Sequence, residues 1–362
     1  MNTAAMEAFY AQMTALGAPG CEVMIARNHE ILYHGCTGET KKNQMYFMYS
    51  ATKPVLITAA MQCVEQGLFA LEDEVSKYLP AFAQGLVDQG GRYVPRQKPL
   101  LIRHLMTMPS GMDYNLFNNY VTRLRALTEA KATTRQIVDA LACQPLLFEP
   151  GTRYNYALSL DVVGAIIEVV TGQSLRDYCQ EHIFRPLGMT RTDFWTPGMV
   201  VEDLAPQYYY NRYVPRLEKA EAANWLVPSQ GFHSGGAGLV SCAEDYIRFT
   251  DALACGESRE GVRLVSAQSI ALMRKDHLAD LGVAEFFSSP SGDQYSYGLG
   301  VRTRKGGGDF GWDGAAGVDL LIEPERGLSV VLTQHVLEWM HMEGNVHVPL
   351  REAVDAFLRD NE

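Results

Sequence analysis

The chain has 362 residues, of which 47% are hydrophobic and 20% are charged, with 31 basic side chains against 42 acidic ones. This length corresponds to roughly two domains and suffices to bury a core without disulfides or a metal ion. The net charge of -11 argues against a nucleic-acid partner or an anionic membrane surface, because both require clustered Lys and Arg side chains.

The cysteines and the N-terminal residues point to a reducing compartment. The seven cysteines are scattered and include no Cys-x-x-Cys pair, which argues against a disulfide framework or a zinc knuckle. The first residues lack the basic and apolar regions of a signal peptide, so we expect a cytoplasmic location. No apolar run reaches the ~20 residues that a membrane span requires, so we expect no membrane partner.

The N-terminal part predicts a helix, a hairpin and a buried helix, in that order. Residues 3–16 have helical spacing, and residues 21–33 alternate around a turn at 27–30, which predicts a β-hairpin. The apolar-periodic stretch 55–64 predicts a buried helix that ends near Gly67.

From Gly67 to about residue 193 the strand signals vanish and helical patterns dominate. Strand composition returns after Gly235-Gly236, most clearly at 297–302, 317–322 and 328–334. An amphipathic helix at 349–359 closes the chain.

This layout predicts an α+β fold, in which an antiparallel β-sheet is flanked by N- and C-terminal helices. Residues 1–65 and 230–362 would form one discontinuous α/β domain, and residues 66–229 a mainly helical domain inserted into it. The connection 206–230 is long and holds four tyrosines and Trp225. Two interpretations of it stay open, a surface loop pinned by its aromatic side chains and one wall of a substrate cleft.

A Ser-x-x-Lys pair, Ser50 and Lys53, lies where the incoming β-segment meets the first buried helix. Pro54 is tolerated only in a first helical turn, so the helix begins near Ser50 and places its hydroxyl at the positive end of the helix dipole. Residues i and i+3 share a helix face, so the Lys53 amine can reach the Ser50 oxygen. Burial would lower the lysine pKa and make the amine a base for a serine nucleophile. Taken alone, the pair is more typical of a helix N-cap with an exposed lysine.

Further motifs accompany this pair in a fixed order, at 102–112, 150–164, 184–190, 234–239 and 311–317. Together with Ser50 and Lys53 they resemble the serine β-lactamase and penicillin-binding-protein superfamily. The resemblance is stronger to its class C-like branch, which includes the family VIII carboxylesterases, and it extends from about residue 20 to about residue 335. It implies a β-lactamase/transpeptidase-like fold and chemistry through an acyl-enzyme.

The resemblance assigns roles to individual residues. Ser50 matches the acylated serine and Lys53 its paired base. Tyr156 matches the motif tyrosine that moves protons between the serine and the leaving group. A nearby ammonium would favour its phenolate, which suits a general base. Tyr154 is the alternative tyrosine, although the count from the preceding Pro-Gly pair favours Tyr156, and a buried core tyrosine is the structural alternative for both.

The third motif departs from the penicillin-processing members, which carry a cationic triplet where this chain has Trp312-Asp313-Gly314. An indole cannot pair with a carboxylate, but it offers apolar area and one N–H donor. Gly314 would let the strand approach the substrate closely, and the N–H groups of Ser50 and Ala315 would form the oxyanion hole. A core tryptophan on a strand is the structural alternative for Trp312.

Leu158 replaces the family's asparagine that contacts the amide side chain of β-lactams. Losing both the cation and the asparagine leaves the acylation machinery intact. We therefore expect a serine hydrolase that forms an acyl-enzyme on Ser50, most simply a carboxylesterase acting on small neutral esters. We expect no metal ion and no cofactor, since the nine histidines show no ligand spacing and no nucleotide-binding motif occurs.

Three alternatives to the carboxylesterase stay open. The same Ser/Lys/Tyr site could serve a β-lactamase or D-amino-acid peptidase, or an acyltransferase that prefers an alcohol or amine acceptor over water. A catalytically idle binding module that kept the fold is the third. The natural acyl chain and the oligomeric state are not determined by the sequence.

Overall fold

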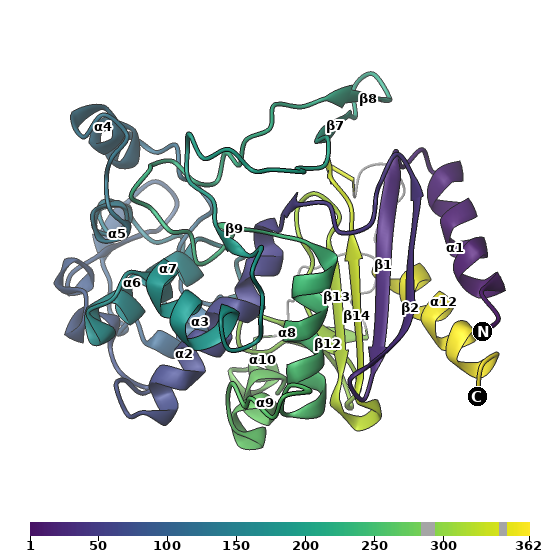
Figure 1. The fold of residues 1–362 in the computed structure, drawn as a ribbon. Coiled ribbons are helices and arrows are strands. Elements are labelled where there is room, and N and C mark those ends of the chain that lie inside the picture. Colours follow the sequence, from purple (N-terminus) through teal and green to yellow (C-terminus); the bar gives the residue numbers. More distant parts are fainter. Residues whose placement is uncertain (284–293, 340–345) are drawn as a thin grey trace.

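The structure is a computed structural model that describes residues 1–283, 294–339 and 346–362. At its centre lies a seven-stranded sheet with the strand order β10-β11-β12-β13-β14-β1-β2, antiparallel throughout. In Figure 1 the terminal helices lie to the right of this sheet and the mainly helical part lies to its left. The strands are β1 (Gly20–Arg27), β2 (Glu30–Gly38), β10 (Tyr295–Tyr297), β11 (Arg302–Arg304), β12 (Phe310–Gly311), β13 (Asp319–Glu323) and β14 (Leu328–Thr333).

Strand β1 joins the two ends of the chain, because it pairs with β2 on one side and with β14 on the other. Met24 lies opposite His34 of β2 and opposite Val331 of β14. The β1–β2 turn is tight, since Asn28 (φ 51°) and His29 (φ 68°) both adopt the left-handed conformation that a two-residue hairpin turn requires. The predicted hairpin is confirmed.

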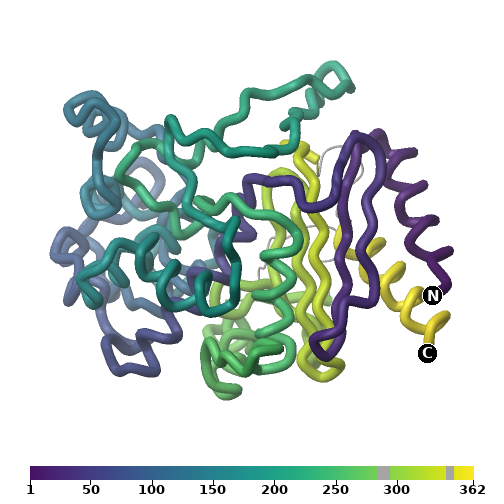
Figure 2. Tube along the Cα trace, in the orientation of Figure 1, coloured from purple at the N-terminus to yellow at the C-terminus, as the bar shows by residue number. Residues whose placement is uncertain are grey.

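The sheet buries both of its faces. Cys21, Val23 and Ile25 of β1 belong to one hydrophobic cluster with α1 (Ala4–Ala15) and α12 (His347–Arg359). Met24 and Ala26 alternate with them and join a larger cluster on the opposite face, which α8 (Ala243–Cys255) and the helical part complete. Figure 2 shows the two chain ends side by side on the outer face. The predicted α+β fold, an antiparallel sheet flanked by the terminal helices, is confirmed.

Helices dominate the segment between β3 (Tyr46–Phe47) and β9 (Leu239–Ser241). The longest are α2 and α6, and α6 is apolar around most of its circumference because it packs against other helices on several sides. The α-helices not yet given are α2 (Lys53–Glu65), α3 (Ile102–Met106), α4 (Asn119–Leu127), α5 (Thr134–Leu141), α6 (Ser159–Thr171), α7 (Leu175–Cys179), α9 (Ala267–Met273) and α10 (His277–Asp280). Shorter helical turns are η1 (Tyr49–Thr52), η2 (Val75–Lys77), η3 (Pro80–Phe82), η4 (Gln180–Phe184) and η5 (Pro324–Arg326).

Three small sheets contradict parts of the sequence analysis. Strands lie within the region where strand signals seemed to vanish, and a hairpin lies inside the connection 206–230, where no strand was predicted. The sheets are β4 (Leu86–Asp88) with β5 (Tyr93–Pro95), then β3 (Tyr46–Phe47), β9 (Leu239–Ser241) and β6 (Asp193–Phe194), and finally β15 (Val336–Leu337), β7 (Tyr208–Asn211) and β8 (Arg216–Lys219). All of these strands have four residues or fewer, so they leave almost no periodic signal.

Two further expectations were wrong. The stretch 297–302, predicted as one strand, is the turn between β10 and β11, where the Gly298 N–H donates to Val301 O at 2.8 Å and Gly300 has a φ of 62°. The region after Gly235-Gly236 also contains the helices α8 to α10 before the strands resume. The division into domains 1–65 with 230–362 and 66–229 stays a prediction. Within the described ranges, no helix combines the length and apolarity needed to cross a membrane.

Candidate active site

Ser50 lies in a constrained turn between β3 and α2. The helix predicted to begin near Ser50 starts as the turn η1 and becomes α-helical at Lys53, with Pro54 in its first turn. Tyr49, directly before the serine, is fully buried in a left-handed conformation (φ 45°), which costs a non-glycine residue ~1–3 kcal/mol. Its hydroxyl donates to Gln207 Oε1 at 2.7 Å, so the surrounding structure holds the turn in place.

Lys53 is fully buried beside the serine. Its Nζ lies 3.1 Å from Ser50 Oγ and donates to the Gly236 carbonyl oxygen at 2.7 Å. Burial lowers the pKa of the Lys53 amine to about 7, although the Asp161 and Asp313 carboxylates act to raise it. A substantial fraction of this amine is therefore neutral near pH 7 and able to accept a proton.

Asp161 positions the carbonyl group that holds Lys53. Its Oδ1 accepts hydrogen bonds from the Ser234 hydroxyl at 2.6 Å and from the Gly236 N–H at 3.2 Å. A side chain at position 236 would come within 2.9 Å of the Asp161 carboxylate, so only glycine lets the two elements approach this closely. The sequence motifs predict no role for Asp161 or Gly236, although these residues lie within the motifs 150–164 and 234–239.

Tyr156 completes a triad around the serine. Its hydroxyl donates to Ser50 Oγ at 2.8 Å and accepts from the Trp312 indole N–H at 3.1 Å. The ring of Tyr154 packs instead edge-on against Tyr297, with 5.4 Å between the ring centroids. Of the two tyrosines weighed in the sequence analysis, Tyr156 is the one whose hydroxyl bonds to Ser50.

The protonation state of Tyr156 differs from the expectation. A nearby ammonium was expected to favour its phenolate, but burial raises the pKa of Tyr156 well above its usual value. The resting side chain is therefore a neutral phenol, and its O–H donates a hydrogen bond to Ser50 Oγ. Its ring stacks against Tyr114 at 5.5 Å and against Trp312 at 5.6 Å. Tyr114 carried no motif signal, because nothing local predicts a contact with Tyr156.

The segment that follows β12 forms the wall opposite Ser50. Trp312 is buried, and the half-buried Asp313 beside it pairs with the buried Arg302 guanidinium at 3.0 Å. The Gly314 N–H donates to Val318 O at 2.8 Å, and a methyl group at Gly314 would overlap the carbonyl oxygen of Met48. The glycine thus brings this wall against the backbone two residues before Ser50.

Ala315 follows Gly314 and is exposed. The N–H of Ser50 lies at the start of a helical turn, where N–H groups have no intrahelical acceptor. The use of these two N–H groups as an oxyanion hole stays a prediction.

The connection 206–230 is fastened next to the site at two points. Gln207 accepts from the Tyr49 hydroxyl, and Asn224 Nδ2 donates to the carbonyl oxygen of Ala237, the residue after Gly236, at 2.7 Å. Trp225 stacks on Phe117 at 6.0 Å, and these side chains are 50% and 55% exposed, respectively. These contacts favour the interpretation of the connection as a cleft wall.

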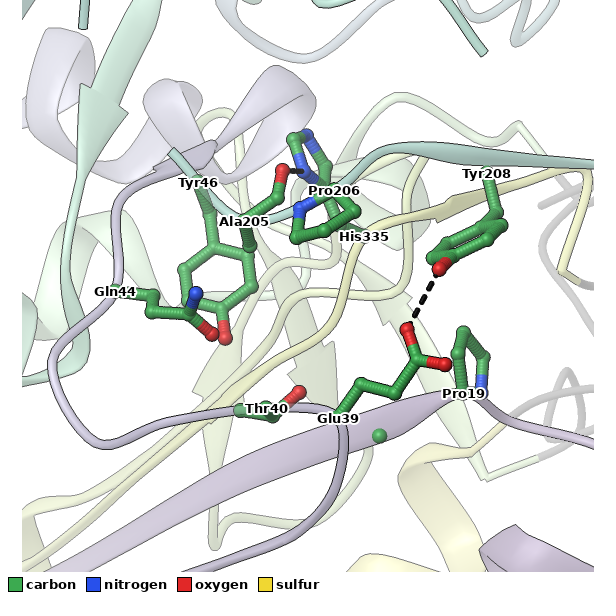
Figure 3. Close-up of a pocket in the computed structure, with 10 residues that line it drawn as sticks. Pro19, Glu39, Thr40, Gln44, Tyr46, Ala205, Pro206, Tyr208 and His335 are labelled. Atoms are coloured by element: carbon green, nitrogen blue, oxygen red, sulfur yellow. Dashed lines mark hydrogen bonds between the residues drawn. The ribbon is translucent and has the colours of Figure 1, made fainter. Parts of the chain in front are cut away.

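The start of this connection encloses a separate small cavity, shown in Figure 3. His335 Nδ1 donates to the Ala205 carbonyl oxygen at 2.9 Å, and the Tyr208 hydroxyl donates to Glu39 Oε2 at 2.7 Å. Burial lowers the pKa of His335 to about 4, so the ring is neutral. The cavity measures about 20 Å³, which is enough for one water molecule and too small for a substrate. The hydrogen bonds made by His335 and Tyr208 beside this cavity hold the connection in place.

Comparisons with known proteins show which family the chain belongs to. A family model described as Beta-lactamase matches residues 6–346. Esterase EstB of Burkholderia gladioli is 28% identical over 374 residues, covering 93% of this chain and 91% of the relative.

Two solved structures share the whole architecture. EstCE1, described as a hydrolase with promiscuous acyltransferase activity, superimposes with a TM-score of 0.75 at 25% identity and covers 97% of both chains. A variant of simvastatin synthase from Aspergillus terreus superimposes with a TM-score of 0.76 at 22% identity, covering 98% of this chain and 95% of that one, and shows the shared fold.

Proposed function

The chain belongs to the β-lactamase family and is a hydrolase, and on that premise we propose that it forms an acyl-enzyme on Ser50 and acts as a carboxylesterase on small neutral esters. One observation carries the proposal: the Ser50 hydroxyl lies between the Lys53 amine, 3.1 Å away, and the Tyr156 hydroxyl, 2.8 Å away. A hydroxyl held between a buried base and a phenol is prepared to become a nucleophile.

Acylation follows from these distances. The neutral Lys53 amine takes the Ser50 proton while Ser50 Oγ bonds to the ester carbonyl carbon. The N–H groups of Ser50 and Ala315 face the oxyanion that develops. Tyr156 then donates its proton to the departing alkoxide as the ester C–O bond breaks, and the proton held by Lys53 restores the phenol. The alcohol therefore leaves with one proton, and Ser50 keeps the acyl group.

Deacylation reverses these roles. The neutral Lys53 amine removes a proton from a water molecule, whose oxygen attacks the acyl carbon. The Ser50 oxygen leaves and regains a proton, and the carboxylic acid is released. The same groups act in both half-reactions, so no further catalytic residue is needed.

The surroundings support a neutral substrate. The Trp312 N–H is already engaged by Tyr156, and the Arg302 guanidinium behind the wall is paired with Asp313. The indole carries no charge and the guanidinium is already paired, so these two side chains do not provide a cation for a substrate carboxylate. Trp312, Phe117 and Trp225 instead offer aromatic area, which favours apolar acyl or alkyl groups. The small-molecule partner is thus an ester, with an amide as the less favoured alternative.

We propose a cytoplasmic location as well. All seven cysteines are free thiols, as expected for a reducing compartment.

Hydrolysis of p-nitrophenyl butyrate tests the proposal. Ser50→Ala is expected to abolish turnover, and Ser329→Ala, which removes another buried hydroxyl on β14, is expected to leave it unchanged. A fluorophosphonate should label the wild-type chain once, on the Ser50 peptide, as read by mass spectrometry. Full turnover by Ser50→Ala, or labelling at another residue, would overturn the proposal.

Acyl transfer is the second candidate, favoured by the likeness to EstCE1 and its promiscuous acyltransferase activity. An acyltransferase would use the same acyl-enzyme and resolve it with an alcohol. Adding a primary alcohol to the assay separates the two: a transfer ester that exceeds the free acid in yield would identify a transferase, and dominant acid formation a hydrolase.

A further inference from the structure

Three side chains that the proposed reaction does not use meet where the tip of the β1–β2 hairpin contacts the end of α8. They are His29, Asp251 and Cys255, and their potential ligand atoms lie within 4.8 Å of one another. Figure 1 shows the hairpin tip at the lower end of the sheet. Within the part of the chain that the structure describes, this is the one group of His, Cys, Asp and Glu side chains close enough to share a metal ion.

The fold places these residues with little freedom. Asp251 and Cys255 are four residues apart in α8 and so project from one face of the helix. His29 occupies the left-handed turn of the hairpin (φ 68°), and its backbone N–H donates to Asp251 Oδ1 at 3.2 Å. Asp251 is 8% exposed, whereas His29 and Cys255 are partly exposed, so an ion could enter from solvent.

We propose that His29, Asp251 and Cys255 bind one Zn²⁺ ion, with a water molecule as the fourth ligand. Tetrahedral zinc with the usual bond lengths separates a nitrogen from an oxygen ligand by about 3.3 Å and a sulfur from an oxygen ligand by about 3.5 Å. His29 Nδ1 lies 2.7 Å from Asp251 Oδ2, and Cys255 Sγ lies 3.7 Å from Asp251 Oδ1. These two separations end on the two oxygens of one carboxylate, and the His29 nitrogen and the Cys255 sulfur lie within 4.8 Å of each other. Rotation of the three side chains would bring one atom of each onto a single ion.

The ligand types select zinc among common ions. Imidazole and thiolate together suit Zn²⁺, whereas Mg²⁺ and Ca²⁺ prefer oxygen ligands alone. On binding, Zn²⁺ forms bonds to an imidazole nitrogen, a carboxylate oxygen and the Cys255 sulfur, and the thiol proton is released to solvent. This proposal departs from the expectation of no metal, which rested on spacing along the chain. His29 and Asp251 are 222 residues apart in sequence.

A cysteine nucleophile is the competing use of the same three residues. Burial and the neighbouring Asp251 carboxylate raise the pKa of the Cys255 thiol to about 11. At neutral pH the thiol stays protonated, which is the opposite of what a nucleophilic cysteine requires. A bound Zn²⁺ ion would link the hairpin to α8 and add to the stability of the native state.

Metal binding to the whole purified chain tests the proposal. The protein is stripped with a chelator, equilibrated with Zn²⁺ and gel-filtered, after which zinc is measured per chain and its affinity determined by competition with a chromogenic chelator. The wild type should retain one ion. Cys255→Ser, His29→Asn and Asp251→Asn should each weaken binding at least tenfold. Co²⁺ in place of zinc should show a thiolate-to-metal charge-transfer band that Cys255→Ser removes.

Cys36→Ser is the matched control, because Cys36 lies on β2 of the same hairpin and is also partly exposed. It should bind zinc and cobalt like the wild type. Ester hydrolysis at the wild-type rate by Cys255→Ser would show that this variant is folded. Less than one zinc per wild-type chain, or undiminished binding in Cys255→Ser, would overturn the proposal and leave the proposed hydrolase unaffected.

Discussion

The indole N–H of Trp312 donates to the hydroxyl of Tyr156 at 3.1 Å, and that hydroxyl donates in turn to Ser50 Oγ. The tryptophan therefore orients the acid of the proposed mechanism in addition to lining the site. Its position is better explained by this hydrogen bond than by packing alone, because an apolar side chain of similar size would leave the phenol oxygen without this donor.

Removing either member of this pair should slow catalysis to different degrees. Tyr156→Phe removes the proton donor for the leaving group, so kcat/KM for p-nitrophenyl butyrate should fall on the order of 10²–10⁴-fold. Trp312→Phe keeps an aromatic ring and loses one neutral hydrogen bond, so the fall should be at most about tenfold. Equal losses in the two variants would contradict the assigned roles.

The rate should depend on pH through Lys53. Its pKa of about 7 means that the amine is protonated and unable to act as a base at lower pH. The value of kcat/KM should therefore rise about tenfold per pH unit below pH 7 and level off above it. Asp161→Asn removes a negative charge that raises the Lys53 pKa, so the midpoint of the profile should move to lower pH. A midpoint that stays in place would contradict this coupling.

Gly314→Ala should damage the site without unfolding the chain. The added methyl group overlaps the Met48 carbonyl oxygen and must push the wall away from Ser50, a displacement that typically costs ~1–3 kcal/mol. We expect kcat/KM to fall more than about tenfold, with a native circular-dichroism spectrum. Gly85→Ala is the control, since its nearest neighbour would be Arg96 Nη1 at 3.6 Å. Normal activity in Gly314→Ala would show that the close approach is not needed.

Trp225 should set the preference for acyl-chain length. Each methylene buried on an aromatic surface contributes ~0.8 kcal/mol, or about fourfold in kcat/KM. Trp225→Ala should flatten this dependence across p-nitrophenyl acetate, butyrate and hexanoate. Tyr213→Ala, an exposed aromatic between β7 and β8, should keep it. If both variants show the wild-type dependence, the acyl chain does not contact the Phe117–Trp225 pair.

The sequence could predict those parts of the site that are local in the chain. Ser50 and Lys53 are three residues apart on one helical turn, so their proximity follows from helix geometry alone. Two other contacts of the site join elements that are far apart in sequence. They are the hydrogen bond from Trp312 to Tyr156 and the one from the Gly236 N–H to Asp161. Periodicity and spacing are local patterns, so they cannot predict which side chains come into contact across such a distance in sequence.

The errors in the fold have equally specific causes. Strand composition at 297–302 concealed Gly298 and Gly300, which form a turn, so β-propensity was given more weight than the glycine signal. The helices α8 to α10 lie between β9 and β10, so strand and helix sequences alternate in this part of the chain. Apolar side chains of these helices join the same core as the central sheet, whose strands come from both ends of the chain. The two long hairpin strands at the start were predictable because the alternating side chains and the turn residues between them both indicate a β-hairpin.

The interleaving of β1 between β2 and β14 has a consequence for the order in which the protein can assemble during synthesis. A ribosome releases Met24 long before its partner Val331 exists. Until then the β1–β2 hairpin exposes one full unpaired edge and the apolar side chains Val23 and Ile25 beside it, which is the arrangement that promotes pairing between different chains. Helices α2 to α7, whose contacts are more local, can form in that interval. The β1 edge is therefore prone to pair with other chains until β14 has been synthesised.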